Sequence, residues 1–316
     1  MSDLFSVFAT AILPIVAIAG VGYLLGRRAD VDPGPLNTVT VYVLAPALVL
    51  HSLATTDLAG GALARIGGGV VAYSVLMLGL AEAVGRLRGE TAPLLGAFTL
   101  SSTFPNAGNF GIPVSAFAFG AVGRSTAVVY IAVEAMVMYT VGVVVASRGR
   151  GSRFDGVGQA LRVPLVYAVA AALLARYLGV VPPVDSAAMS TLKLVGDASI
   201  PVMLLILGLQ LARRESGTTL RSAVPASVLK LGVAPVVAVG IALALGFENA
   251  DVARVFVLEC AMPAAVTPLV LVAEFSPDGT DGRVAEYVST VVLVTTLASV
   301  PLLTGLIVFL QAGVVF

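Results

Sequence analysis

The sequence has little charge and almost none of the side chains that bind metals or form disulfides. Only 11% of its 316 residues are charged, tryptophan is absent, and there is one cysteine and one histidine. The single cysteine, Cys260, excludes an intramolecular disulfide framework, and one histidine with one cysteine cannot form a zinc site. The apolar segments also lack the neighbouring aspartate clusters that suit Mg²⁺. We therefore expect no metal, no cofactor and no enzymatic activity.

The charges that are present cancel, with 18 basic and 18 acidic residues. A net charge of zero gives no indication of a nucleic-acid partner. By contrast, 58% of the residues are hydrophobic and the mean hydropathy is +1.02, which is far too apolar for a soluble domain of this length. Ser2 and Asp3 precede the first apolar run without a basic segment, which predicts that this run is not a cleaved signal peptide.

Apolar segments long enough to cross a bilayer recur along the whole chain. A membrane-spanning helix needs about 20 predominantly apolar residues. Ten segments fit this requirement, and they cover residues 4–25, 36–54, 62–84, 92–119, 126–146, 161–181, 193–212, 222–246, 252–274 and 284–311. The sequence therefore predicts an all-α polytopic membrane protein with ten transmembrane helices.

Two of these segments are each interrupted by a pair of prolines. The fourth reads Phe-Pro-Asn-Ala-Gly-Asn-Phe-Gly-Ile-Pro over residues 104–113, and the ninth reads Met-Pro-Ala-Ala-Val-Thr-Pro over residues 262–268. In lipid every backbone polar group needs a partner, so a helix breaks at membrane depth only where protein buries the break or water lines it. Matched interrupted helices in two halves of a chain point to the binding site of a transporter.

The two halves of the chain resemble each other in the placement of their prolines. Pro105 and Pro263 lie 158 residues apart, and Pro46 and Pro201 lie 155 apart. Several such pairs in the same order favour an internal repeat, with residues 1–147 as a first five-helix unit and 161–316 as a second. A short basic loop at 148–160 joins them. An odd number of helices per unit places the two units in opposite orientations, as in many secondary transporters.

The distribution of basic residues predicts the orientation in the membrane. With the N-terminus outside, twelve arginines fall on the inner side, and four arginines with one lysine fall on the outer side. This excess satisfies the positive-inside rule. We therefore expect a multi-pass protein of the cell membrane, with both termini outside.

These motifs resemble the auxin efflux carrier family, whose plant branch is the PIN-formed proteins. The fourth segment is similar to the family's Pro-Asn…Gly-Ile-Pro crossover, and the ninth, followed by residues 273–275, is similar to its partner. Pro46 with His51 resembles a motif of the second span, and Lys230 with Pro235 resembles one of the eighth. The long hydrophilic loop of the plant proteins is here about a dozen residues, so regulation through that loop cannot be carried over.

The resemblance implies a fold and a mode of action. Helices 1, 2, 6 and 7 would form a scaffold, and helices 3–5 and 8–10 would form a transport domain in which helices 4 and 9 cross at their breaks. It also implies an elevator-like movement, a homodimer, and substrates that range from auxin-like aromatic acids to small dicarboxylates.

The residues at the breaks are the candidates for substrate binding. Asn amides and the free N–H groups of a half-helix can bind a carboxylate without a buried lysine. The candidates are Asn106, Asn109, Pro105, Pro263, Thr267 and, through the resemblance, His51. The alternatives are that the Asn side chains only satisfy the broken backbone, that the prolines only kink their helices, and that the histidine is structural.

Three charged residues inside predicted helices are candidates for proton or ion coupling. An intramembrane carboxyl is a functional candidate by default, and Glu134 and Glu259 lie well inside helices 5 and 9. The plant branch carries Gln at both positions, so these carboxyls are a departure from it. Lys230 is the third candidate, and its alternatives are a structural pair with a glutamate or a position reaching the membrane interface.

The leading hypothesis is a secondary active transporter that exports or exchanges small organic anions, with proton coupling as an added hypothesis. The alternative is a sodium-coupled organic anion symporter of the bile-acid type, in which Asn106, Thr267 and Glu259 would help to hold Na⁺. The repeated, interrupted helices argue against a channel.

Overall fold

The computed structural model describes residues 4–29, 31–55, 60–147, 164–212, 220–268, 271–272 and 283–316. All regular elements within these ranges are helical, which confirms the all-α class for the described part of the chain. The predicted loop at 148–160 and the residues 273–275 lie outside the described ranges.

The elements of the first half are α1 (Leu4–Val7), η1 (Phe8–Ile12), α2 (Leu13–Ala29), α3 (Pro33–Val39), η2 (Thr40–Leu44), α4 (Ala45–Thr55), α5 (Gly60–Leu87), α6 (Leu94–Thr103), η3 (Ala107–Gly111), α7 (Ile112–Val137), η4 (Met138–Gly142) and α8 (Val143–Ser147). Those of the second half are α10 (Pro164–Tyr177), α11 (Ala187–Ala212), α12 (Leu220–Val228), η5 (Leu229–Val233), α13 (Ala234–Leu245), α14 (Ala250–Cys260) and α16 (Arg283–Gln311). The η segments are single π-helical turns next to α-helices.

Seven helical stretches in the described ranges are long and apolar enough to cross a membrane. They are Leu4–Ala29, Pro33–Thr55, Gly60–Leu87, Ala107–Ala146, Ala187–Ala212, Leu220–Leu245 and Arg283–Gln311. Six of these stretches overlap predicted helices 1, 2, 3, 7, 8 and 10. They are the first three stretches, Ala187–Ala212, Leu220–Leu245 and Arg283–Gln311. The count of ten spans therefore stays a prediction. The difference between seven and ten concerns the broken segments and the shorter helix α10.

The predicted fourth segment is broken where its prolines lie. Helix α6 ends at Thr103, and Phe104 adopts extended φ and ψ of −81° and 117°, the conformation that a following proline favours. Helical structure resumes at Ala107 and continues as a 40-residue stretch, which is itself divided at Gly120 by a non-helical φ of 60° and ψ of −136°. The predicted boundary between the fourth and fifth segments, at residue 119, lies beside this glycine.

The predicted ninth segment is broken in the same way. Helix α14 begins at an Asn249 cap, whose side chain accepts from the amides of Asp251 and Val252, and it ends at Cys260 before the Met262-Pro263 sequence. Residues 261–266 are not helical, and helical structure returns at residue 267. Both interruptions therefore lie in the middle of the predicted segments.

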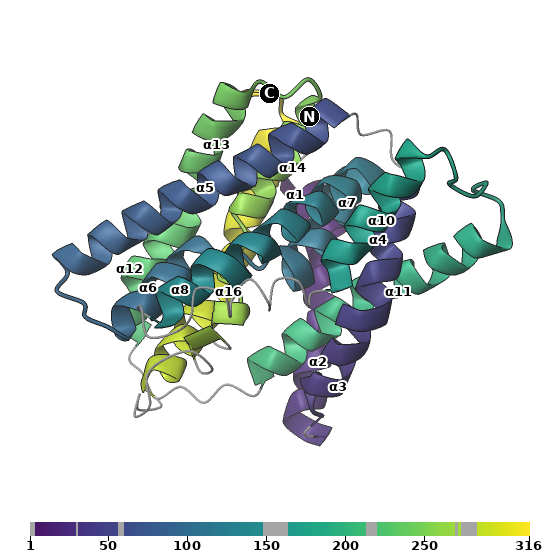
Figure 1. Ribbon diagram of the computed structural model, residues 1–316. Helices are drawn as coiled ribbons and strands as arrows, with labels where there is room; N and C mark the ends of the chain where they lie inside the picture. The colour runs from purple at the N-terminus through teal and green to yellow at the C-terminus, as the bar shows by residue number, and fades with distance from the viewer. Residues whose placement is uncertain are drawn as a thin grey trace.

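The helices form two groups around the first broken helix. In Figure 1, α2, α3, α4, α10 and α11 occupy one side, α5, α6, α12 and α13 occupy the other, and α7 runs between them. Helix α2 packs along α11, α10 packs on α4, and α14 packs on α7. Both chain ends are drawn at the same end of the molecule, and α1 contacts α16 there.

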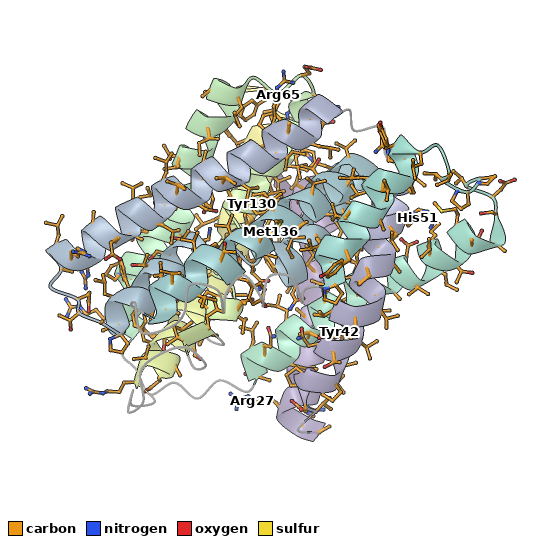
Figure 2. The ribbon with its side chains drawn as sticks, in the orientation of Figure 1. Arg27, Tyr42, His51, Arg65, Tyr130 and Met136 are labelled. Carbon is orange, nitrogen blue, oxygen red and sulfur yellow. The ribbon has the colours of Figure 1, made fainter. Side chains whose placement is uncertain are left out.

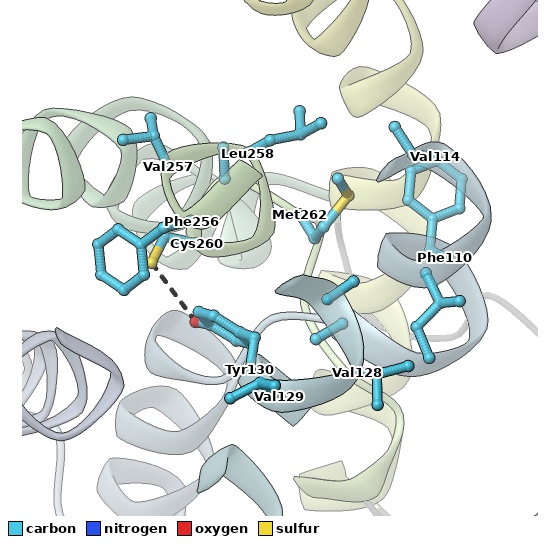
Figure 3. Close-up of a cluster of buried hydrophobic side chains, with 14 of the residues drawn as sticks. Phe110, Val114, Val128, Val129, Tyr130, Phe256, Val257, Leu258, Cys260 and Met262 are labelled. Atoms are coloured by element: carbon cyan, nitrogen blue, oxygen red, sulfur yellow. Dashed lines mark hydrogen bonds between the residues drawn. The ribbon is translucent and has the colours of Figure 1, made fainter. Parts of the chain in front are cut away.

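The two broken helices share a buried core. Tyr130 of α7 and Phe256 of α14 are fully buried, and their ring centroids are 6.1 Å apart. The Tyr130 hydroxyl lies 3.5 Å from the Sγ atom of Cys260 (Figure 3). Since lipid supplies no hydrophobic force between helices, such close packing holds α7 and α14 together.

Helices α2 and α11 approach each other closely at glycines. A Cβ added to Gly208 would collide with the Ala19 carbonyl oxygen, and one added to Gly22 would collide with the Leu205 carbonyl oxygen. Small residues at such contacts allow membrane helices to pack backbone against backbone.

Gly208→Ala is expected to lower thermal stability in detergent by forcing α2 and α11 apart, with a cost of about 1–3 kcal/mol for overpacking. The matched control is Gly20→Ala on α2, because an added Cβ there meets no atom within 4 Å. The midpoint of thermal aggregation, followed by size-exclusion chromatography, should fall for the first variant and hold or rise slightly for the second. Equal midpoints would contradict the close contact.

Candidate functional site

The two helix breaks cross and bond to each other through their backbones. The Asn106 amide donates to the Pro263 carbonyl at 2.7 Å, and the Ala265 amide donates to the Phe104 carbonyl at 3.0 Å. Pro105 and Ala264 face each other as an isolated antiparallel bridge. Each break thus supplies the partners that the other lost when its helix ended.

A side chain from a third helix completes the crossing. The amide of Ala264 donates to the Oγ1 atom of Thr295 in α16 at 3.1 Å, and Thr295 itself donates to the carbonyl of Val291 at 2.7 Å. The Thr295 hydroxyl therefore accepts from a backbone amide that has no backbone partner in the crossing.

The two helices that end at the crossing direct their last carbonyls at one ammonium group. Lys230 Nζ donates to the Cys260 carbonyl at 2.8 Å and lies 3.4 Å from the Thr103 carbonyl. It also donates to the Tyr73 hydroxyl at 2.8 Å, which lies 3.1 and 3.2 Å from the same two carbonyls. Both side chains are buried.

This arrangement balances the lysine charge without a carboxylate. The C-terminus of a helix carries roughly half a negative charge, so the ends of α6 and α14 together offset about one positive charge. Lys230 forms no ion pair with Glu134 or Glu259 in the described structure. It is also fully buried beside the crossing, rather than extended toward a membrane interface.

A cavity of about 400 Å³ lies against the crossing, and Lys230 is not among the described residues that line it. The break and the first turn after it line one wall, with Asn106, Asn109 and Ala107 among the residues. Asn106 is 7% exposed, and its Nδ2 atom has no hydrogen-bond partner. An unused amide donor therefore lies beside the cavity at the N-terminal end of a helix, where N–H groups and the dipole favour an anion.

The opposite wall comes from the other group of helices. Asn37 of α3, Thr40 and Tyr42 of η2, and Leu165 at the start of α10 line it. Figure 2 labels Tyr42, which is 63% exposed, so the cavity wall continues to the molecular surface on this side. The cavity thus lies between the crossing and the helices packed against α11.

The structure brings five of the nine predicted site residues to this cavity, namely Pro105, Asn106, Asn109, Thr267 and Glu134. Pro263 does not line it but contributes its carbonyl to the crossing. Lys230 and Glu259 lie apart from the cavity lining.

The two predicted carboxyls have different surroundings. Glu134 of α7 lines the cavity, and its Oε1 atom has no hydrogen-bond partner. Glu259 of α14 is fully buried, and its Oε1 atom accepts from the Ser115 hydroxyl at 2.5 Å. A Cβ added to Gly111 would collide with Glu259 Oε2, so this carboxyl fills the space against the first turn of α7.

His51 lies elsewhere on the molecule. It is absent from the cavity lining, and Figure 2 places it on α4 away from Tyr42. It interacts electrostatically with an ionic cluster in which Asp197 accepts from Arg124 and Lys193, each at 2.6 Å. The histidine therefore faces charged groups at the contact between α4, α7 and α11.

Tyr73 and Thr295 are the site residues that sequence reasoning missed. Each is a hydroxyl within a long apolar helix, and such residues usually bond their own backbone or the interface. The distance between Tyr73 and Lys230 in the sequence gave no sign that the two would meet. A weak signal was available in the burial expected of a tyrosine in mid-helix, since a buried phenol needs a partner.

Long apolar helices around a polar crossing define a polytopic membrane protein with a cavity beside two interrupted helices. A family model described as membrane transport protein matches residues 7–156 and 157–307. The chain therefore belongs to the membrane transport protein family, which confirms the resemblance to the auxin efflux carriers.

Two curated relatives match almost the full length of the chain. An "Uncharacterized transporter" of Methanothermobacter thermautotrophicus is 28% identical over 294 residues, covering 91% of this chain and 93% of the relative. A "Putative malonate transporter" of Rhizobium meliloti is 25% identical over 325 residues, covering 96% and 95%.

Lys230→Met is expected to destabilise the crossing, because it removes the donor shared by two carbonyls and the Tyr73 hydroxyl. An unsatisfied buried group costs about 1–3 kcal/mol, so the thermal midpoint in detergent should fall clearly. Ser227→Ala is the control on the same helical stretch, since its hydroxyl bonds the Ala223 carbonyl of its own helix. A Lys230→Met protein as stable as the control would contradict the charge balance described above.

Proposed function

We propose that the protein is a secondary active transporter of small organic carboxylates. The observation that carries this proposal is the unpartnered, buried Asn106 amide in a cavity at the start of the α7 half of a broken helix. Asn109 and Thr267 line the same cavity and add polar groups. A carboxylate there would receive side-chain and backbone N–H donors together with the favourable helix dipole.

The proposal includes ten spans arranged as two inverted five-helix units, 1–147 and 161–316. The crossing of two similarly broken helices and the position of both termini at one end of Figure 1 support it. The two stretches matched by the family model meet between residues 156 and 157, inside the predicted loop. The non-helical Gly120 supports a division of Ala107–Ala146 into parts of helices 4 and 5.

An elevator-type movement fits the two groups of helices. The cavity lies between the crossing and the group formed by α2, α3, α4, α10 and α11. A transport domain carrying the crossing would slide along that scaffold and expose the cavity first on one side and then on the other. The homodimer implied by the family resemblance would hold the scaffold in place.

The conformation described here has the features of an inward-open state. The cavity lining includes exposed Asn37, near the start of α3, and Pro164, the first residue of α10. With the N-terminus outside, both positions lie toward the cytoplasm, on the side where Arg27 and Arg28 end α2. In this state the cavity would exchange substrate with the cytoplasm.

The substrate class is small carboxylates, from auxin-like aromatic acids to dicarboxylates. The name of the Rhizobium relative supports inclusion of dicarboxylates. Proton coupling through a buried glutamate is part of the proposal. Sodium coupling of the bile-acid type is the alternative, and Na⁺-dependent uptake at fixed pH would favour it.

In proteoliposomes, the purified protein is expected to take up at least one labelled carboxylate from a panel of mono- and dicarboxylic acids with saturable kinetics. Asn106→Ala should lower that uptake by at least tenfold, because it removes the free amide donor. Thr191→Ala is the control, since its exposed hydroxyl bonds the Ala187 carbonyl of its own helix. Uptake of no carboxylate, or full activity of Asn106→Ala, would overturn the proposal.

The orientation of the chain in the membrane can be tested by cysteine labelling, because the single native cysteine is buried. Thr91→Cys is expected to lie in a cytoplasmic loop and Asp185→Cys in an external one, and both residues are exposed. In intact cells a membrane-impermeant maleimide should label the second variant only, and permeabilisation should expose the first. The reverse pattern would invert the assigned topology.

A further inference from the structure

We propose that Glu134 alone carries the coupling proton and that the transported species is a monoanion, so that one proton and one negative charge move together. This inference rests on the proposed transport function and concerns the charge balance of its cavity. It assigns different roles to the two buried glutamates.

Among the residues that the structure describes, the cavity lining contains one acidic side chain and no basic one. Its lining residues include Glu134 but no lysine, arginine or histidine, and its other titratable side chains are Tyr42 and Tyr139. An ionised Glu134 and a substrate carboxylate in this space would repel each other without a cation between them. Binding of an anion therefore favours the protonated form of Glu134, and the proton travels with the substrate.

The position of Glu134 brings it close to the proposed carboxylate site. A Cβ added to Gly108 would lie 2.7 Å from Ile131 Cδ1, so the turn after the break packs directly on this part of α7. Glu134 follows Ile131 by three residues and shares its face of the helix. Both residues line the cavity together with Gly108 and Asn109.

Among the described residues, charged and titratable groups outside the cavity lining do not supply the missing cation. Those that interact electrostatically with Glu134 are Lys230, Glu259, Tyr73, Tyr130 and Cys260. Lys230 is the cation among them, and it is held by two helix C-termini and the Tyr73 hydroxyl. Its charge is thus already offset by those two helix ends.

Glu259 is placed as a positioning residue. Its carboxyl accepts from Ser115, lies against Gly111 and has no exposed surface. Glu259 is not among the described residues that line the cavity. Its contacts join α14 to the first turn of α7, so it fixes the position of the two broken helices relative to each other.

The charge expected of the substrate follows from the same lining side chains. The cavity offers neutral amide and hydroxyl groups and one helix N-terminus, which together suit one carboxylate. A dianion would bring a second negative charge with no positive partner. The protein should therefore prefer a monoanion over a dianion of equal size, and a dicarboxylate would be carried as its singly protonated monoanion.

The test compares Glu134→Gln with Glu259→Gln in proteoliposomes, using malonate and its monoamide as acids of matched size. For the wild type we expect at least tenfold preference for the monoamide at pH 7, accumulation driven by an inward proton gradient, and no response to a valinomycin-imposed potential. Glu134→Gln should lose gradient-driven accumulation and retain exchange at equal pH. Glu259→Gln should retain gradient-driven accumulation.

Three results would overturn the inference. They are accumulation by Glu134→Gln equal to wild type, loss of gradient dependence in Glu259→Gln alone, and wild-type uptake that responds to the imposed potential. The last measurement uses unmodified protein, so it decides the matter even if a variant misfolds. Wild-type protein that neither takes up nor exchanges any carboxylate would instead reject the transport function on which the inference rests.

Discussion

The fold depends on satisfying the backbone of two helices that stop in the middle of the molecule. Each unpaired amide or carbonyl at membrane depth costs several kcal/mol, and two interrupted helices expose several at once. Here the backbones of the two breaks pair with each other, Asn106 with Pro263 and Ala265 with Phe104. Lys230 contacts the last carbonyls of the two helices that end there. Asn106, whose side-chain amide has no hydrogen-bond partner, lies at the first break and also lines the cavity.

The same constraint separates charges by side. On one face of the crossing two helices end, and a positive side chain offsets their carbonyls. On the other face helical structure begins again, and the free N–H groups suit a negative ligand. The lysine offsets the two helix ends at the crossing, and the described residues that line the cavity contain no basic side chain.

Much of this arrangement could be predicted from the sequence, because prolines have unambiguous consequences inside apolar helices. Pro105 and Pro263 predicted both breaks, and Asn106 with Glu134 pointed to the cavity. Thr267, a predicted binding residue, also lines that cavity. The all-α class followed from hydropathy alone. The number of spans did not, because broken and short helices do not reach the length of a full span.

The other site contacts depend on how each helix is rotated against its neighbours. A single sequence does not contain that information. Glu134 and Glu259 look alike in sequence, but α14 directs one carboxyl against Gly111 while α7 directs the other into the cavity. His51 lies nine residues beyond cavity-lining Tyr42, and that shift along the helix places it among ionic groups instead. Thr295 and Tyr73 carry no local signal, because their partners come from distant helices.

The pairing of Tyr73 with Lys230 has an evolutionary consequence. The two residues are 157 positions apart, and the carbonyls they share, at Thr103 and Cys260, are separated by the same interval. If the halves descend from one duplicated ancestor, Tyr73 and Lys230 occupy equivalent places and meet across the former symmetry axis. Identical lysines there would force two ammonium groups together, and identical tyrosines would leave two helix ends without a counter-charge. The fused chain could therefore stabilise its crossing only once its halves had become different.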